Sequence, residues 1–224
     1  MSLIHRYNRL IMRLKQIVKP GSFPGSVQYW EERYRKGGTS GSGSYNLLAE
    51  FKAQVLNTFV KDHNIKSVIE FGCGDGNQLS LANYPSYIGL DVAPSAISIC
   101  AEKFSTDKTK SFFLYNSKAF FDNHQIFKVE LSLSTDVIFH LVEDEIFENY
   151  MQHLFDAADK FVIIYASNFN KNQMVHEKDR NFTSWVENKR KDWNLLEKID
   201  NMYPYDPSDP ENTSKADFFI FSKA

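Results

Sequence analysis

Three glycines at alternate positions follow a short apolar run, and this segment offers the clearest chemistry in the sequence. It reads Val68-Ile69-Glu70-Phe71-Gly72-Cys73-Gly74-Asp75-Gly76. Glycine permits positive φ and lets a ligand approach the bare backbone, at the carboxyl ends of strands where open α/β sheets bind ligands. Asp91 ends the next apolar run. A carboxylate at that place accepts hydrogen bonds from both hydroxyls of a ribose. The pattern predicts a nucleoside-binding site.

The spacing of the glycines and the nearby acids restrict which nucleoside fits. Dinucleotide-binding turns read G-x-G-x-x-G, whereas here the third glycine comes one residue early and Asn77 takes its place. Glu70 and Asp75 would repel a pyrophosphate and favour a ligand that carries positive charge. An NAD-linked enzyme stays as an alternative, which equilibrium binding of the two cofactors would separate.

Two motifs carry a resemblance to a known family. E-F-G-C-G-D-G followed by Y-I-G-L-D-V resembles motifs I and II of the class I S-adenosylmethionine-dependent methyltransferases. The resemblance implies that S-adenosylmethionine is the cofactor. It also implies a set of cofactor-binding residues near the methionine part, the ribose and the adenine: Trp30, Glu70, Gly72, Gly74, Asp91, Ser117 and Asp136. Core packing is the alternative interpretation of Trp30.

The resemblance extends to a stretch that lines the methyl-transfer centre in small-molecule methyltransferases. Asp136-Val137-Ile138-Phe139-His140-Leu141 is similar to their D-V-x-x-H-L pattern, which would place Asp136 near the methionine amine and His140 near the acceptor. His176 is a second candidate base, and Arg180 suits a carboxylate or phosphate on the acceptor. The alternatives are a structural histidine at a helix end for His140 and a solvated helix start for the pair His176 and Arg180.

These residues lead to one functional hypothesis and one rival. We expect a methyltransferase that acts on the oxygen or nitrogen of a small polar acceptor, such as a sugar or another metabolite. Metal-ligand spacing is absent, so we expect no metal. The rival is a non-catalytic module or scaffold that keeps the methyltransferase fold and binds the cofactor.

The elements that must position these residues alternate along the chain. Strands are predicted at 67–71, 87–91, 111–115, 129–133 and 161–165, and helices at 45–62, 94–104 and 143–158. A helix near 179–191 and strands near 195–200 and 217–222 follow, the two strands joined without a helix. We therefore expect an α/β fold: a Rossmann-like, seven-stranded, mostly parallel sheet with an antiparallel C-terminal hairpin and helices on both faces.

Ahead of this domain, residues 1–44 form a predicted N-terminal helical extension with a glycine-rich cap, and residues 45–224 form the methyltransferase domain. Residues 1–30 hold five basic side chains and no acid. Apolar positions recur there every three or four residues, which indicates an amphipathic helix. This helix packs on the protein body or on a second copy in a homodimer, or it contacts an anionic surface. The segment GGTSGSGS at 37–44 has the composition of a flexible loop, which we expect to cover the site, with a passive connector as the alternative.

The composition of the chain restricts its possible binding partners and its cellular compartment. The chain has 224 residues, 42% of them hydrophobic, which suits one domain with a large core. The formal charge of −2 does not suggest a protein that coats nucleic acid, so we expect no nucleic acid partner. No apolar run approaches the roughly 20 residues that span a bilayer, so we expect no stable membrane insertion. Two cysteines and no signal peptide indicate a cytoplasmic protein.

Overall fold

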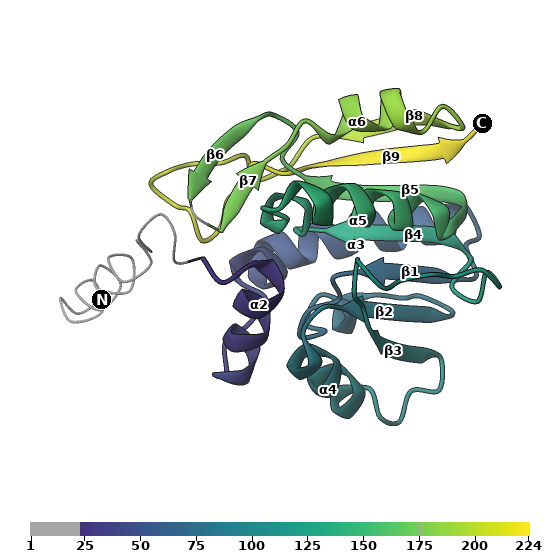
Figure 1. Cartoon of the computed structure of the whole chain (residues 1–224), viewed down its shortest axis with the longest axis horizontal. Helices are drawn as coiled ribbons and strands as arrows, with labels where there is room; N and C mark the ends of the chain where they lie inside the picture. Colours follow the sequence, from purple (N-terminus) through teal and green to yellow (C-terminus); the bar gives the residue numbers. More distant parts are fainter. Residues whose placement is uncertain (1–22, 175) are drawn as a thin grey trace.

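The computed structural model describes residues 23–174 and 176–224 and consists of one large sheet with helices on both faces (Figure 1). The predicted basic helix before residue 20 lies outside the described residues. The described part of the chain begins with α2 (Ser26–Arg35), a short 3₁₀ turn η1 (Ser42–Ser44) and the long helix α3 (Asn46–Asp62). None of the helices in the described ranges is long and apolar enough to cross a bilayer.

Seven strands form the sheet in the order β3-β2-β1-β4-β5-β9-β8. The first five are parallel, and β9 runs antiparallel to both β5 and β8. Their bounds are β1 Val68–Phe71, β2 Tyr87–Asp91, β3 Lys110–Leu114, β4 Val129–Thr135, β5 Ala158–Ala166, β8 Trp193–Ile199 and β9 Asp217–Lys223. The predicted fold class is confirmed. The last connection places β9 between β5 and β8, so the two edge strands of the sheet are β3 and β8.

Alternating apolar residues along the central strands divide the core between the two faces. On β5, Val162 and Ile164 face one cluster, whereas Ile163 and Tyr165 face the other. The first cluster packs against α5 (Asp144–Asp156) and α6 (Phe182–Lys189), and the second packs against α3 and α4 (Pro94–Lys103). A strand that is buried on both faces is apolar at most positions. This is why the second half of β5 could be recognised in the sequence as an apolar run.

Local signals set several helix boundaries. Pro94 occupies the first turn of α4, where its missing N–H costs nothing. Asp144 and Glu145 open α5, where their charges complement the helix dipole. The Asn181 side chain accepts a hydrogen bond from the Ser184 amide at the start of α6. This cap places the helix start at Phe182, three residues later than the sequence predicted.

Two features of the fold were not predicted. The glycine turn after β1 leads into a single 3₁₀ turn, η2 (Leu79–Leu81), and then directly into β2. Beyond β5, the strands β6 (Lys171–Met174) and β7 (Glu177–Asp179) pair in a separate two-stranded sheet. His176 therefore lies at the turn of a hairpin and not on a helix.

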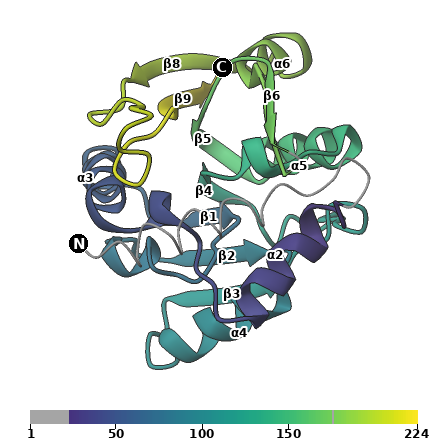
Figure 2. The same ribbon diagram turned by 90° about the vertical axis from the view of Figure 1, so that its left-hand side faces the viewer.

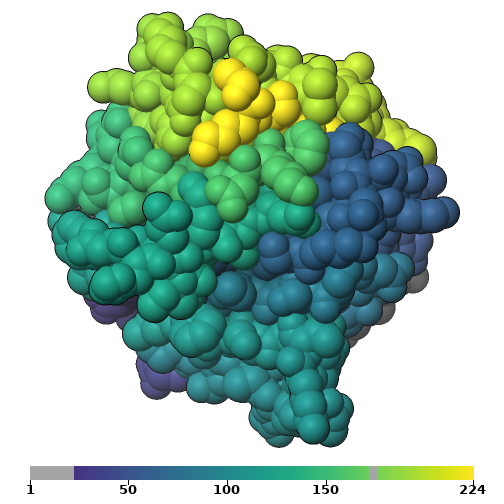
Figure 3. Space-filling model, turned by 90° about the vertical axis from the view of Figure 1, so that its right-hand side faces the viewer, coloured from purple at the N-terminus to yellow at the C-terminus, as the bar shows by residue number. Residues whose placement is uncertain are grey.

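The carboxyl ends of the parallel strands meet at one edge of the sheet, and α2 lies across this edge (Figure 2). The β6–β7 hairpin and the loop between β8 and β9 gather at the same side (Figure 1). Figure 3 shows the opposite side of the molecule, where the teal segment next to β3 projects at the bottom. The elements that carry the predicted site residues thus converge on the edge that α2 covers.

Candidate functional site

The glycine turn binds the ends of β1 and β2 together. The amides of Gly72 and Cys73 both donate to the Leu90 carbonyl, at 2.7 and 3.0 Å. The Asp91 carboxylate accepts from the amide of Gly74 at 2.9 Å and from the amide of Ala93 at 2.9 Å. Burial raises the pKa of Asp91 to about 6, although these amides oppose the shift. Asp91 is therefore largely ionised at neutral pH, and its remaining lone pairs can accept hydrogen bonds from a ligand.

Gly72 and Gly74 are required by the protein's own packing as well as by any ligand. Both have positive φ, +88° and +57°. A Cβ at position 72 would overlap the Val137 side chain, and a Cβ at position 74 would overlap Ser40. The sequence explained these glycines by positive φ and by ligand approach, and the packing of Val137 and Ser40 is a further reason for them.

A first cavity lies over the glycine turn. Asp91 and Tyr115 line it at the ends of β2 and β3, and Asp136 and His140 line it beyond β4. Trp30 of α2 also lines the cavity, and its ring centroid lies 5.7 Å from that of Tyr34. The cavity combines a carboxylate, exposed backbone and aromatic rings, the set that the sequence predicted for a nucleoside ligand.

The side chains of Glu70 and Ser117 are less available to a cofactor than the sequence predicted. Glu70 is buried and accepts hydrogen bonds from the Tyr87 hydroxyl at 2.6 Å and from Thr135 Oγ1 at 2.7 Å. Burial raises the pKa of Glu70 despite both bonds. Glu70 lines the first cavity, but much of its hydrogen-bonding capacity is already used. Ser117 is buried after β3 and does not line the cavity, where Tyr115 stands in its place.

Asp136 forms an ion pair with Lys52, a residue that the sequence analysis missed. The Lys52 side chain is fully buried on α3, and the Asp136 side chain is 17% exposed. The ammonium also lies 5.3 Å from the Tyr165 ring centroid. Asp136 adopts a positive φ of 58°, an unusual conformation for a residue other than glycine. A lysine within an amphipathic helix resembles any surface lysine, so nothing in the sequence marked Lys52 as buried.

A second, open cavity adjoins the first. Trp30, Ser40, Asp136 and His140 line both cavities. The second cavity extends between α2 and the loop before α3 on one side, and β7 and the β8–β9 loop on the other. A ligand in the first cavity and a second ligand in the outer cavity would meet at these shared residues.

The two candidate bases come together in this outer cavity. Their ring centroids are 6.4 Å apart, and His140 Nδ1 lies 3.5 Å from the main-chain oxygen of His176. His140 also packs edge-on against Trp30, and His176 stacks on Tyr29 at 5.0 Å. Burial lowers the pKa of His140 to about 3 and also lowers the pKa of His176. Both rings are therefore neutral at pH 7, and so low a pKa makes the buried His140 ring a weak base.

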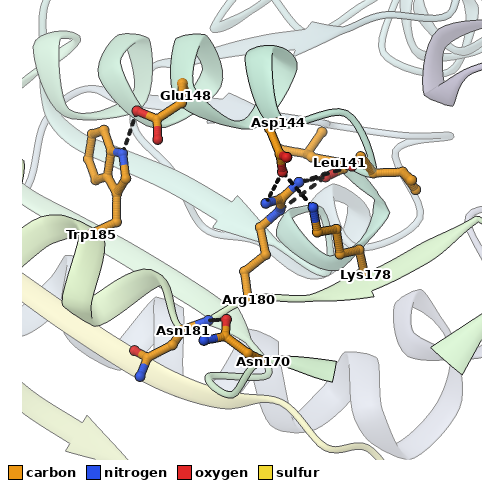
Figure 4. A network of polar contacts seen from close by, with 9 residues as sticks. Leu141, Asp144, Glu148, Asn170, Lys178, Arg180, Asn181 and Trp185 are labelled. Atoms are coloured by element: carbon orange, nitrogen blue, oxygen red, sulfur yellow. Dashed lines mark hydrogen bonds and ion pairs between the residues drawn. The ribbon is translucent and has the colours of Figure 1, made fainter. Parts of the chain in front are cut away.

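The structure does not bring Arg180 into either cavity (Figure 4). Its guanidinium donates to the carbonyl oxygens of Leu141 and Val142 and pairs with Asp144 at 2.7 Å. It also lies 4.4 Å from the Phe147 ring centroid. These contacts fix the segment that follows His140, so Arg180 positions the wall of the site and does not face an acceptor.

Several hydrogen bonds hold α2 and the glycine-rich loop over the first cavity. Ser40 and Asp75 are joined twice: the Ser40 amide donates to the Asp75 carboxylate at 2.9 Å, and the Asp75 amide donates to Ser40 Oγ at 3.0 Å. At the start of α2, the Ser26 amide and hydroxyl both donate to Glu143. The glycine-rich loop therefore contacts the glycine turn directly.

No family model matches the sequence. A curated relative, a small RNA 2′-O-methyltransferase from Arabidopsis thaliana, is 24% identical over 139 residues. The match covers 57% of this chain, and the chain spans about 15% of that relative's length.

Solved structures of methyltransferases share the fold. The methyltransferase domain of a bacterial Hen1 superposes with a TM-score of 0.62 at 21% identity, covering 80% of this chain and 100% of its own. NodS, an N-methyltransferase from Bradyrhizobium japonicum WM9 solved with S-adenosylhomocysteine, gives 0.67 at 13% identity, with 89% and 98% covered. Magnesium protoporphyrin IX methyltransferase from Synechocystis PCC 6803, solved with S-adenosylmethionine, gives 0.64 at 13% identity, with 91% and 100% covered. The chain has the fold of the S-adenosylmethionine-dependent methyltransferases.

The exclusion of nucleic acid as a partner is wrong, because similar proteins include small RNA methyltransferases. That exclusion rested on the net charge of the whole chain. Overall charge reports on non-specific binding along a phosphate backbone. The end of a single strand that enters a cavity needs only a few local contacts, which a charge sum does not reveal.

Proposed function

We propose that this protein is an S-adenosylmethionine-dependent methyltransferase, with the cofactor in the first cavity and the methyl acceptor in the second. One observation carries the proposal: two cavities meet at Trp30, Asp136 and His140, and one of them lies over the glycine turn and Asp91. The fold shared with methyltransferases solved with this cofactor supports the same assignment.

The residues of the first cavity fit this cofactor. Asp91 has lone pairs for the ribose hydroxyls, and Tyr115 offers an aromatic surface for the adenine. The carboxylate of Asp136 and the ring of Trp30 favour a positively charged methionine part, by charge and by cation–π attraction. Bound there, S-adenosylmethionine supplies a methyl group: an acceptor lone pair bonds to the methyl carbon while the carbon–sulfur bond breaks and its electrons stay on sulfur.

The protein's own contribution is to hold the acceptor and remove its proton. His140 and His176 are neutral and share the outer cavity, so each offers a ring to the proton that a hydroxyl or ammonium acceptor loses. Burial makes His140 a weak base, so His176 is the stronger candidate for this role. Trp30 and Ser40 of the glycine-rich loop line the wall that both ligands would share, and alignment of the two ligands supplies much of the rate enhancement. We propose a small polar acceptor methylated on oxygen or nitrogen.

RNA is the second candidate acceptor, and the similarity to small RNA methyltransferases favours it. Transfer of a labelled methyl group from S-adenosylmethionine tests both candidates, with a panel of sugars and amines in one arm and purified small RNA in the other. Incorporation that depends on His140 or His176 supports the proposal. His124→Ala is the matched control, because His124 is exposed in the loop between β3 and β4.

A non-catalytic role would give a different result in the same assay. Binding of S-adenosylhomocysteine without methyl transfer to either panel would favour the scaffold interpretation. Binding of a nicotinamide dinucleotide in place of S-adenosylhomocysteine would favour the NAD-linked alternative.

A further inference from the structure

Arg33 lies on α2 at the wall of the outer cavity, next to both candidate bases. It lines that cavity together with Tyr29, His140 and His176. Its Nε donates to the Thr39 carbonyl, and its guanidinium carbon lies 5.4 Å from the Trp30 ring centroid. These contacts hold the stem of Arg33, and no hydrogen bond of the described residues uses its two terminal nitrogens.

The charge of Arg33 is not neutralised within the described part of the chain. The other cations of the site are paired: Lys52 with Asp136, and Lys215 with Asp179 at 3.5 Å. Among the described residues, Arg33 takes part in no ion pair, whereas Arg180 and Arg190 do. A half-buried guanidinium without a counter-charge in a ligand cavity indicates a ligand that supplies one.

The positive charge of Arg33 affects the pKa of both histidines. It contributes to the lowered pKa of His140, together with His176 and Lys215, although burial is the main cause. It also lowers the pKa of His176, where Glu177 acts in the opposite direction. An anion beside the guanidinium would offset this influence on both rings.

We infer that Arg33 binds an anionic group, a carboxylate or a phosphate, of the methyl acceptor and thereby presents the acceptor's hydroxyl or amine to His140 and His176. The inference rests on the proposed function for the identity of the ligand as a methyl acceptor. The planar guanidinium suits this role, since its parallel N–H groups bind two oxygens of a carboxylate or phosphate at once. Arg33 thus has the anion-binding role that the sequence suggested for Arg180.

The opposite wall of the cavity narrows the ligand class further. Glu177 and Glu211 line the cavity from β7 and the β8–β9 loop, and Tyr205 and two prolines, Pro207 and Pro210, line it with apolar surface. Carboxylates accept hydrogen bonds from hydroxyl or amino groups and repel a second anionic charge. The acceptor that fits is a molecule with one anionic group and several hydroxyl or amino groups, such as a sugar acid, a sugar phosphate or the phosphate-bearing end of an RNA strand.

Nuclear magnetic resonance of the histidine side chains tests this inference without any methyl transfer. The probe is glucose 1-phosphate, and neutral glucose at the same concentration is its control. In the wild-type protein, we expect the phosphate to shift the ring signals of His140 and His176 in a saturable way and to leave His63 unchanged. Glucose alone should shift them at least roughly tenfold less at equal concentration, because it lacks the charge that pairs with the guanidinium.

Matched variants assign the effect to Arg33. Arg33→Gln should abolish the response, Arg33→Lys should retain part of it, and Arg35→Gln should leave it intact, since Arg35 is exposed on the same helix. Circular dichroism checks that each variant is folded. Equal responses of wild type and Arg33→Gln, equal responses to phosphate and glucose, or no response to the phosphate would overturn the inference.

A second arm identifies the source of the anion. A short 5′-phosphorylated oligoribonucleotide that saturates the response at lower concentration than glucose 1-phosphate assigns the group to RNA, and the reverse order assigns it to a small metabolite. Both results keep Arg33 as the anchor. Because the titration uses no methyl donor, its failure would leave the proposed methyl transfer standing, and failed methyl transfer would not alter the titration.

Discussion

Removing either partner of the ion pair between Lys52 and Asp136 should destabilise the protein, but the loss in the free energy of unfolding should differ between the two. Lys52 is fully buried, whereas Asp136 is 17% exposed and lines both cavities. Removing one partner of a buried pair typically costs 3–5 kcal/mol, because the remaining charge is left in a medium of low polarity. Asp136→Asn keeps the size of the side chain and tolerates the positive φ, so it tests the charge alone.

The structure gives approximate magnitudes for each variant. In Asp136→Asn the buried ammonium loses its partner, and Glu70 nearby compensates in part, so we expect a loss of about 3 kcal/mol in the free energy of unfolding. In Lys52→Met the remaining carboxylate reaches water through the cavities, and we expect a loss of about 1–2 kcal/mol. The double variant should be more stable than the sum of the two losses predicts, by about 2 kcal/mol.

Urea unfolding followed by circular dichroism measures all three values, provided that the slope of stability against urea stays constant. Lys61→Met on the exposed side of α3 is the control and should change stability by less than about 0.5 kcal/mol. The reasoning fails if the two losses are additive within about 0.5 kcal/mol, or if Lys52→Met costs as much as Asp136→Asn.

Three further predictions concern the cavities. Asp91→Ala should weaken binding of S-adenosylhomocysteine by roughly 10- to 100-fold in calorimetry, because charge-assisted hydrogen bonds to the ribose are lost, and unchanged affinity would rule out Asp91 as the ribose ligand. The ionised carboxylate is the form that binds, and burial raises the pKa of Asp91 to about 6, so wild-type affinity should be constant above about pH 7 and fall as pH drops through 6; a flat profile would contradict this. The loop at 36–45 should exchange its amide hydrogens more slowly when S-adenosylhomocysteine binds, and Ser40→Ala, which breaks the double link to Asp75, should reduce that difference; equal exchange with and without ligand would contradict a covering role.

A fourth prediction separates the two histidines. If the acceptor is a hydroxyl, removing the ring that serves as base should lower the methyl-transfer rate by roughly 10²- to 10⁴-fold with little change in cofactor affinity. Rates of His140→Ala and His176→Ala that both stay within about tenfold of wild type would show that transfer needs only alignment.

The sequence predicted the sheet well because its strands carry their own signal. β1, β2 and the second half of β5 are largely buried and read as short, mainly apolar runs with turn residues between them. In β4, apolar residues alternate with polar ones. The Asp91 site was predictable for the same reason, since a strand, a glycine turn and an acid at the next strand end are local patterns.

The parts that the sequence missed depend on contacts between distant segments. Lys52 is buried only because α3 packs beneath Asp136, 84 positions further along the chain. Arg180 reads as an anion ligand until the fold turns it toward the carbonyl oxygens of Leu141 and Val142. A helix start was the alternative interpretation of the pair His176 and Arg180, because the periodicity of a short polar segment does not distinguish a hairpin turn from a helix start.

Calorimetric titration with S-adenosylhomocysteine tests the central claim most directly, because it needs neither an acceptor nor turnover. The account predicts one binding site per chain with a dissociation constant in the micromolar range, about −8 kcal/mol, and no comparable binding of NAD⁺ or NADH under the same conditions. Absence of S-adenosylhomocysteine binding to the folded protein, or tighter binding of a nicotinamide dinucleotide, would contradict it.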